Sequence, residues 1–259
     1  MKNILSEIVA EKRITVDAAK KIFPLDEVKK NLSPGNFRPE KVIVKSGRSL
    51  IAECKLQSPA KGRLNETHSV VEMAKIYEEN GAKMLSVHTD KHFLGSNEDF
   101  QKVRATVKLP LLRKDFVIDE YQIYEARLLG ADAILLIVRI LSPDELKKFL
   151  AVTHELGMNA LVEIHDAEDL KVAQSTDAKF LGINNRNLKT FQTSIENTLQ
   201  LMPQVDKSRI IISESGVFTF DDVQKLYAAG CDGLLIGEGL VRAPDMAAQT
   251  RRFGFFAED

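Results

Sequence analysis

The sequence predicts an α/β protein: a single (β/α)8 TIM barrel with an N-terminal helical extension. Three observations predict this fold. The chain has 259 residues, and one such barrel takes about 250. Short apolar strands alternate with helical patterns at intervals of roughly 26 residues. Six of the eight expected strands end in polar, charged or glycine residues, which the parallel strands of a barrel bring to one shared rim.

The first 48 residues differ from the rest and are expected to form the extension, with residues 49–259 as the barrel. Apolar side chains share one helical face in residues 4–9 and again in residues 16–23, which predicts two short helices. Residues 31–39 are rich in Pro, Gly, Asn and Ser and are expected to form a loop. Because this segment is too small for its own core, we expect it to plug or brace the barrel, or to cover part of the site.

The remaining elements alternate in order. The expected strands end at residues 52–55, 84–88, 112–115, 133–137, 161–165, 182–186, 212–216 and 235–239. The expected helices cover residues 70–81, 98–107, 119–130, 143–157, 167–175, 194–202, 220–230 and 240–253. Ser142 and Thr219 precede patterns that begin with acidic residues, as helix caps do. A doubly wound sheet has similar spacing, but it concentrates its site at one switch point, so polar residues at nearly every strand end favour a barrel.

Composition excludes several classes of protein. The net charge is −1, from 36 basic and 37 acidic residues, whereas nucleic acid usually requires a clearly basic face. No apolar stretch approaches the length of a membrane span. The two cysteines, Cys54 and Cys231, have no metal-binding spacing, which also disfavours a disulfide framework. We therefore expect a cytoplasmic protein, acting as a monomer on a small molecule, with no nucleic acid or membrane partner.

Strand parity sorts the first strand ending. Glu53 and Lys55 lie on one face with Ile51, and Cys54 lies on the other, where we expect it to pack against helices. An acid and a base buried on the same face are costly without a reason. They form either a structural ion pair across the barrel mouth or a positioned pair that binds an anion and moves protons.

Lys114 follows Leu112 on the inward face of the next polar strand ending. Near Glu53 and Glu163 it is expected to stay protonated and act as an acid. Arg113 and Asp115 have the opposite parity and are expected to pair outside the barrel.

Glu163 is a stronger candidate than His165, which falls where the chain turns toward the next helix. A metal site that combines Glu163 and His165 with His88 and His92 is the weaker alternative. The sequence of residues 88–92 is more typical of a polar loop than of a set of metal ligands. We expect no metal.

The last three polar strand endings carry a second group of candidates. Asn184 and Arg186 share one parity, and Glu214 points inward. Residues 215–216 and 237–239 bring glycines to the ends of the last two strands. Residues 237–239 lead directly into a helix. This arrangement predicts a phosphate cradle. Residues 58–62 either add a loop over the same ligand or form an ordinary surface turn.

These residues, in this order, resemble the indole-3-glycerol phosphate synthase family of tryptophan biosynthesis, whose barrel carries a similar N-terminal extension. The resemblance covers almost the whole chain. It is carried by residues 51–55 with 58–59, and by residues 112–116, 161–165, 182–188, 213–216 and 235–238.

The resemblance implies closure of the indole ring of 1-(2-carboxyphenylamino)-1-deoxyribulose 5-phosphate, which releases carbon dioxide and water and needs no cofactor. It implies that Lys114 protonates the ketone oxygen and that Glu163 is a second acid–base group. Glu53 and Asn184 would serve the later loss of the hydroxyl.

The resemblance also implies the binding roles. Lys55 and Arg186 would hold the substrate carboxylate, and Glu214 and Ser215 the sugar hydroxyls. The phosphate would be held by Ser58, Gly216, Gly237 and Glu238. Two positions depart from the family pattern: Ala60 stands where a serine is usual, and His88 where a leucine is usual. The first is expected to weaken one polar contact, and the second puts a polar ring in an apolar wall.

Two alternatives remain. Phosphoribosylanthranilate isomerase is a barrel of the same pathway, but it relies on an inward cysteine after its first strand, whereas Cys54 has outward parity. A non-catalytic barrel that binds a sugar phosphate or a protein would have no reason to keep buried charges at Glu53, Lys114 and Glu163.

Overall fold

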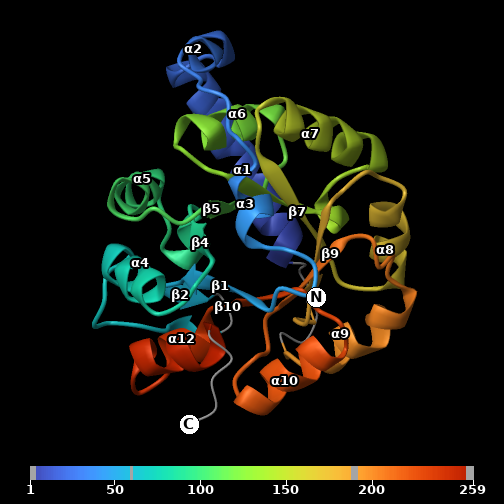
Figure 1. Ribbon diagram of the computed structural model, residues 1–259. Coiled ribbons are helices and arrows are strands. Elements are labelled where there is room, and N and C mark those ends of the chain that lie inside the picture. Colours follow the sequence, from blue (N-terminus) through green and yellow to red (C-terminus); the bar gives the residue numbers. More distant parts are fainter. Residues whose placement is uncertain (1–3, 59–60, 188–191, 255–259) are drawn as a thin grey trace.

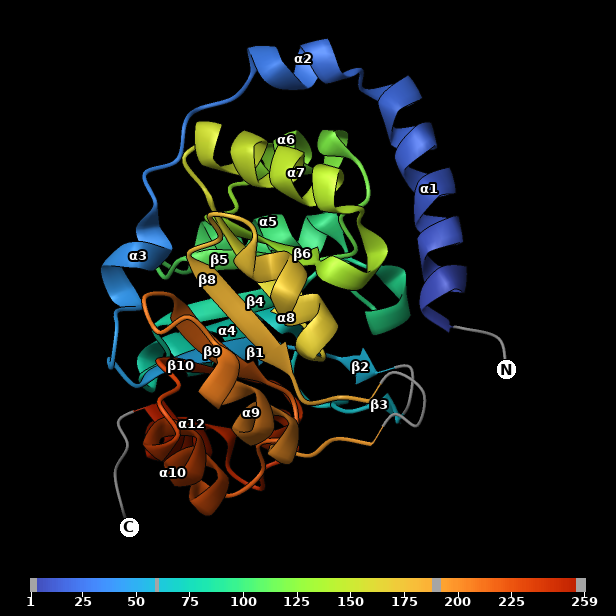
Figure 2. The same ribbon diagram turned by 90° about the vertical axis from the view of Figure 1, so that its right-hand side faces the viewer.

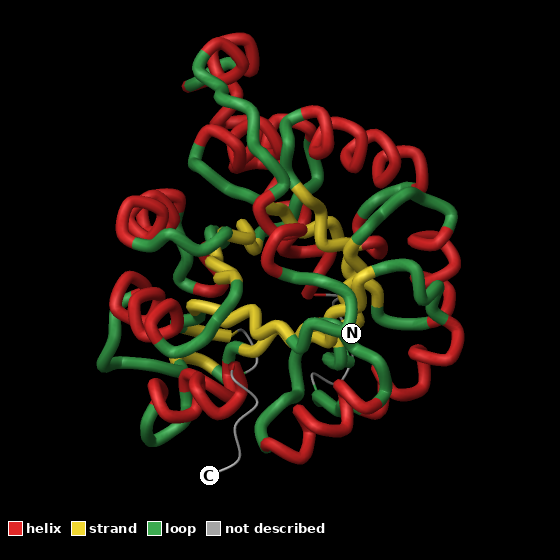
Figure 3. Tube along the Cα trace, viewed as in Figure 1, coloured by secondary structure: helices red, strands yellow, loops and turns green. Residues whose placement is uncertain are grey.

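The structure, a computed structural model, describes residues 4–58, 61–187 and 192–254. Eight parallel strands form a closed barrel in sequence order, and helices surround it (Figures 1 and 3). β1 closes the ring by pairing with both β10 and β4. The predicted TIM barrel with an N-terminal helical extension is therefore confirmed. The barrel strands are β1 (Ser49–Cys54), β4 (Met84–His88), β5 (Leu111–Lys114), β6 (Ala133–Ile137), β7 (Asn159–Ile164), β8 (Phe180–Asn184), β9 (Ile210–Glu214) and β10 (Gly233–Ile236).

The barrel helices begin where the sequence places their caps. The hydroxyl of Ser142 accepts from the N–H of Glu145, and that of Thr219 accepts from the N–H of Asp222. The helices are α4 (Val70–Glu79), α5 (Asn97–Thr106), α6 (Glu120–Leu128), α7 (Pro143–Glu155), α8 (Ala167–Gln174), α9 (Glu196–Leu201), α10 (Phe220–Ala228), α11 (Glu238–Val241) and α12 (Met246–Gly254). One predicted helix, residues 240–253, is instead two, because Pro244 cannot donate the hydrogen bond that would continue it.

Short elements fill several of the loops. The loop after β1 contains a small hairpin that the sequence analysis did not predict. These elements are the hairpin strands β2 (Gln57–Ser58) and β3 (Gly62–Arg63) and the 3₁₀ helices η1 (Lys91–Phe93), η2 (Val138–Ile140) and η3 (Met202–Gln204). No helix in the described ranges combines the length and hydropathy that a bilayer crossing requires.

Strand parity divides the core into two layers. The outward residues of the strands, Leu50, Ala52 and Cys54 among them, pack in the large cluster beneath the helices. The inward residues form a separate cluster inside the barrel, and the polar site residues continue these same inward rows. The inward cluster consists of Ile43, Ile51, Met84, Leu112, Ala133, Leu135, Ile137, Leu161, Phe180, Ile210, Ile212 and Leu235. The predicted outward orientation of Cys54 is confirmed.

The extension differs from the prediction. Residues 4–22 form one helix, α1 (Ile4–Ile22), instead of two short ones, because no glycine or proline interrupts this stretch. The next helix, α2 (Leu25–Lys30), begins directly after Pro24. A third helix, α3 (Arg38–Val42), takes up the end of the segment expected to be a loop.

The extension runs from one end of the barrel to the other (Figure 2). α1 lies at the end where the strands deliver their polar residues, α2 packs beside α6, and α3 lies at the opposite end. There Ile43 is fully buried inside the barrel. On either side of it, Arg38 Nη1 lies 3.0 Å from Asp132 and Lys45 Nζ lies 2.8 Å from Asp232. This segment closes the floor of the barrel.

Candidate active site

A cavity of about 140 Å³ opens at the rim of the barrel where the strands end. Eight of the twelve predicted site residues line it: Glu53, Lys55, Ser58, Lys114, Glu163, Asn184, Arg186 and Ser215. Glu214 lies beneath them in direct contact with Lys114. Gly216, Gly237 and Glu238 are not among the lining residues.

Lys114 stands at the centre of the polar group. Its Nζ donates to Oε2 of Glu214 and lies 3.4 Å from Oε2 of Glu163. Burial opposes the charge of this ammonium, but Glu214, Glu163 and Glu53 outweigh burial and raise the pKa of Lys114. The lysine is therefore protonated at neutral pH, as its position in the sequence predicts.

Glu163 is buried between Lys114, His165 and Asn184. Its Oε1 lies 3.4 Å from Nε2 of His165. Burial favours the neutral acid, yet Lys114, His165 and a hydrogen bond from Asn184 lower the pKa of Glu163. Asn184 is oriented by the N–H of Arg186, which donates to its Oδ1 at 2.9 Å, and this leaves the amide NH₂ for Glu163.

Glu214 is in a different electrostatic state. Burial raises its pKa to about 7, although Lys114 opposes the rise. Its Oε1 is buried without a hydrogen-bond partner. This oxygen occupies the space beside Gly182, where an ideal Cβ would stand 2.0 Å from it. Gly182 thus leaves room for the carboxylate that holds Lys114.

Glu53 forms a second ion-pair group at the mouth of β1. Its Oε2 lies 3.3 Å from Nζ of Lys55, and its Oε1 lies 2.9 Å from Nε2 of His88. Burial favours the neutral acid, but Lys55, His88 and Lys114 hold the pKa of Glu53 well below its usual range. Gly237 makes room for this carboxylate as well, because a Cβ there would lie 2.2 Å from Oε2.

The residues predicted to cradle the phosphate follow β9 and β10. Ser215 and Gly216 follow β9 with positive φ values of 68° and 77°, and a non-glycine residue in that region is uncommon. Gly237 precedes the single turn of α11, and the carboxylate of Glu238 lies 2.7 Å from Nζ of Lys61. The predictions for Pro59 and Ala60 concern positions outside the described residues, as does the Leu188 end of the fourth family motif.

The cavity has an apolar wall whose residues were not predicted from the sequence. Leu135, Ile137 and Leu235 contribute to it from strand ends, and their inward parity was a signal that could have identified them. Phe93 and Phe116 contribute from loops, for which no periodic signal exists. The rest of the wall comes from Ile4, Leu5 and Ile8 of α1.

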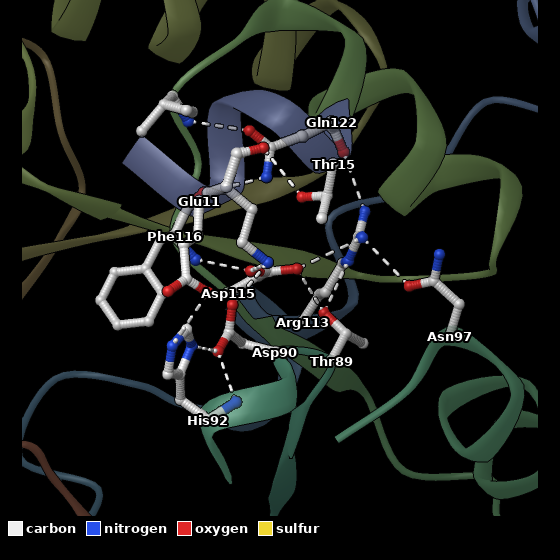
Figure 4. A network of polar contacts seen from close by, with 12 residues as sticks. Glu11, Thr15, Thr89, Asp90, His92, Asn97, Arg113, Asp115, Phe116 and Gln122 are labelled. Carbon is white, nitrogen blue, oxygen red and sulfur yellow. Dashed lines mark hydrogen bonds and ion pairs between the residues drawn. The ribbon is translucent and has the colours of Figure 1, made fainter. Parts of the chain in front are cut away.

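A network of charges holds α1 in this position (Figure 4). Lys12 of α1 places its Nζ 2.6 Å from Asp90 and 2.6 Å from Asp115. Asp115 also lies 3.4 Å from Nη2 of Arg113, which in turn lies 2.6 Å from Glu125 of α6. The predicted pairing of Arg113 with Asp115 is confirmed, although Asp115 also lines the rim cavity. The anchoring lysine was not predicted from the sequence.

Comparison with known proteins identifies close relatives. A family model described as indole-3-glycerol phosphate synthase matches residues 5–253. The chain is 41% identical over 256 residues to the indole-3-glycerol phosphate synthase of Acetivibrio thermocellus, and the alignment covers 96% of this chain and 98% of the relative. It is 44% identical over 252 residues to the protein of the same name from Carboxydothermus hydrogenoformans, which covers 93% and 96%.

Solved structures with low sequence identity share the fold. The 3-hexulose-6-phosphate synthase of Salmonella typhimurium superimposes with a TM-score of 0.63 at 12% identity, over 80% of this chain and 97% of that one. A thiamine phosphate pyrophosphorylase from Pyrococcus furiosus gives a TM-score of 0.59 at 14% identity, over 80% and 95%. At these identities the likeness concerns the barrel alone.

Proposed function

The chain belongs to the indole-3-glycerol phosphate synthase family, and we propose that the rim cavity is its active site, with Lys114 as the general acid. The protein is a carboxy-lyase of tryptophan biosynthesis. It closes the indole ring of 1-(2-carboxyphenylamino)-1-deoxyribulose 5-phosphate and releases carbon dioxide and water. The observation that carries the site assignment is the ammonium of Lys114, whose side chain is 11% exposed and which is held between Glu214 and Glu163.

Ring closure requires a proton donor at the ketone oxygen. As the aromatic carbon attacks the ketone carbon, negative charge develops on that oxygen, and Lys114 delivers the proton that makes it a hydroxyl. An ammonium held among carboxylates in a buried site suits this task, because its surroundings are already arranged when the charge develops. The carboxylate then leaves as carbon dioxide, and its bonding electrons stay in the ring.

Dehydration requires a second donor and a base. The new hydroxyl must leave as water, and a proton must be taken from the ring system. Glu163 is the second acid–base group, because it contacts both Lys114 and His165. Glu53 and Asn184 serve this step as well, and Glu53 is ionised at neutral pH, so it is in the form that can accept a proton.

Binding groups surround these reacting groups. We assign Lys55 and Arg186 to the substrate carboxylate, since both line the cavity. Ser215 and Glu214 are assigned to the sugar hydroxyls, and the unpartnered Oε1 of Glu214 leaves an acceptor for one of them. The phosphate is assigned to Ser58 and to the backbone N–H groups of Gly216, Gly237 and Glu238.

The apolar wall fits the aromatic end of the substrate. Leu5 and Ile8 of α1, with Phe93 and Phe116 of the loops, face the same cavity as Lys114. A phenyl ring bound there is removed from water while its polar substituents reach the charged groups. The extension is thereby assigned a part in substrate binding, and we propose that it and the barrel fold as one unit.

The direct test is to incubate the purified protein with the carboxyphenylamino deoxyribulose phosphate. Formation of indole-3-glycerol phosphate is monitored by the fluorescence of the indole ring. Turnover without added metal or cofactor is the expected result. The isomerase alternative requires a reactive inward cysteine, whereas Cys54 is buried in the helix layer and burial raises the pKa of its thiol. Folded protein that binds the substrate without turnover would instead favour a non-catalytic barrel.

We further propose that the protein works in the cytoplasm as a monomer. Sedimentation equilibrium tests the second point, and a mass well above 29.0 kDa at micromolar concentration would contradict it.

A further inference from the structure

His88 ends β4 with its imidazole in the cavity, directly beside Glu53. Nε2 of the ring lies 2.9 Å from Oε1 of the carboxylate, and both side chains are only 6% exposed. The carboxylate of Glu53 therefore has a buried polar partner at the end of the neighbouring strand.

The direction of the imidazole is fixed by its surroundings. The ring stacks on Phe93, with centroids 4.3 Å apart and planes 14° apart. Phe93 belongs to η1, whose start is capped by Asp90 through the N–H of His92 at 2.8 Å. The backbone after His88 is held as well, because the N–H of Thr89 donates to the carbonyl of Lys114 at 3.2 Å. A ring held in this way offers Nε2 in one direction.

The protonation of the pair follows from the charges around it. Three charged groups face the imidazole: Glu53 of β1, Lys55 just after β1, and Lys114 of β5. Burial lowers the pKa of His88, and the positive charges of Lys55 and Lys114 lower it further. Glu53 raises this pKa but does not outweigh them. The ring is therefore neutral at pH 7. Because an ionised carboxylate only accepts hydrogen bonds, Nε2 carries the ring proton and donates it to Oε1.

We propose that His88 is a positioning residue for dehydration: its Nε2–H holds Oε1 of Glu53, which keeps the carboxylate ionised and leaves Oε2 beside Lys55. This role rests on the proposed function, because Glu53 accepts a proton there. A neutral donor suits the task, since it stabilises the carboxylate without adding a third positive charge beside Lys55 and Lys114. Glu53 is held from both sides, by His88 at Oε1 and by Lys55 at Oε2, 3.3 Å away.

Two variants separate the hydrogen bond from the packing of the ring. His88→Leu removes the donor and keeps an apolar wall, whereas His88→Gln places an amide N–H within similar reach of Oε1. For His88→Leu we expect kcat to fall about tenfold, the lower end for a hydrogen bond to a charged group, with little change in KM. The acidic limb of the pH profile should move up by about one unit, because a carboxylate that loses a donor is easier to protonate. His88→Gln should restore both.

His154→Leu is the matched control, because it makes the same change in α7, outside the cavity lining. It should leave kcat and the pH profile unchanged. Thermal unfolding followed by circular dichroism checks that each variant is folded. A folded His88→Leu variant with the kcat and acidic limb of the wild type would overturn the proposal, and so would a His88→Gln variant as impaired as His88→Leu.

A measurement without turnover tests the contact itself. NMR titration of the His88 ring in the resting protein should give a lower pKa in Glu53→Gln than in the wild type, because Glu53 is the neighbour that raises it. An unchanged or higher value would contradict the contact. The two levels of failure are distinct: an inactive wild type refutes the proposed function, whereas an active wild type matched by the His88 variants refutes only the role of His88.

Discussion

The carboxylate of Glu214 occupies the space that a side chain on Gly182 would need, since an ideal Cβ there would lie 2.0 Å from Oε1. The other oxygen of the same carboxylate accepts the hydrogen bond from Lys114. A residue with no side chain thus determines where the proposed general acid stands. β8 and β9 run side by side in the barrel, and their register fixes this fit.

Gly182→Ala is therefore expected to impair catalysis without any new contact to substrate. The added methyl group forces Glu214 to move, and Lys114 loses its closest partner. We expect kcat to fall at least tenfold, because misplaced catalytic groups cost rate even when they remain present. Steady-state kinetics measure it. Gly233→Ala, also on a barrel strand but with 3.2 Å or more around the added Cβ, is the control. Equal activity of the two variants would contradict the explanation.

Lys114→Ala tests the general acid directly. General acid–base groups usually contribute about 10²- to 10⁴-fold, so we expect kcat to fall by that factor while product affinity changes little. Stopped-flow turnover and product titration by fluorescence provide the two numbers. Activity within tenfold of the wild type, in a folded variant, would remove Lys114 from this role.

Ile8→Ala tests the contribution of α1 to substrate binding. Ile8 is 4% exposed and lines the cavity, and its truncation removes apolar contact worth about 1.5–2.5 kcal/mol. We expect KM to rise by about tenfold, with a smaller effect on kcat. Ile14→Ala on the same helix is the control, because Ile14 is 71% exposed. A KM unchanged by Ile8→Ala would place α1 outside the binding site.

Lys12→Met tests the anchor of α1 and its dependence on pH. Removing an ammonium shared by two buried carboxylates should lower the free energy of unfolding by about 1.5–3 kcal/mol at pH 7. Burial opposes the charge of Asp90, but Lys12 and His92 lower its pKa. The contribution of Asp90 to the free energy of unfolding is therefore full above its pKa in the unfolded chain, about 3.9. It is lost as the pH falls through the lower pKa of Asp90 in the folded protein.

Urea unfolding of the wild type and Lys12→Met should thus differ by a constant amount from pH 5 to 8 and converge below about pH 4. Lys21→Met, an exposed lysine of the same helix, should match the wild type throughout. A difference that persists undiminished at pH 3 would assign the effect to packing rather than to the ion pairs.

Strand periodicity explains how much of the site the sequence predicts. Successive side chains alternate faces, so the inward orientation of Glu53, Lys114 and Glu163 follows from counting along each strand. The barrel itself follows from repeated units and their polar ends. Helix boundaries are less certain from sequence, as α1 demonstrates: its apolar face continues through residues whose propensities permit helix but do not require it.

Contacts between distant segments explain what the sequence analysis missed. That His88 meets Glu53 depends on the register of β1 against β4, in which Glu53 pairs with Ser86. The anchoring of α1 by Lys12 depends on two loops that follow β4 and β5. Neither arrangement leaves a periodic signal, because each is decided by packing of segments far apart in the chain.

The floor of the barrel has a consequence for synthesis. The extension precedes the barrel in the chain, yet Lys45 binds Asp232, 187 residues later, and Ile43 packs inside a ring that only β10 completes. The floor therefore cannot close until β10 has emerged from the ribosome. Contacts of such long sequence separation form slowly, so the extension is expected to settle late although it is translated before the barrel, and nascent chains remain open at this end until β10 has been made.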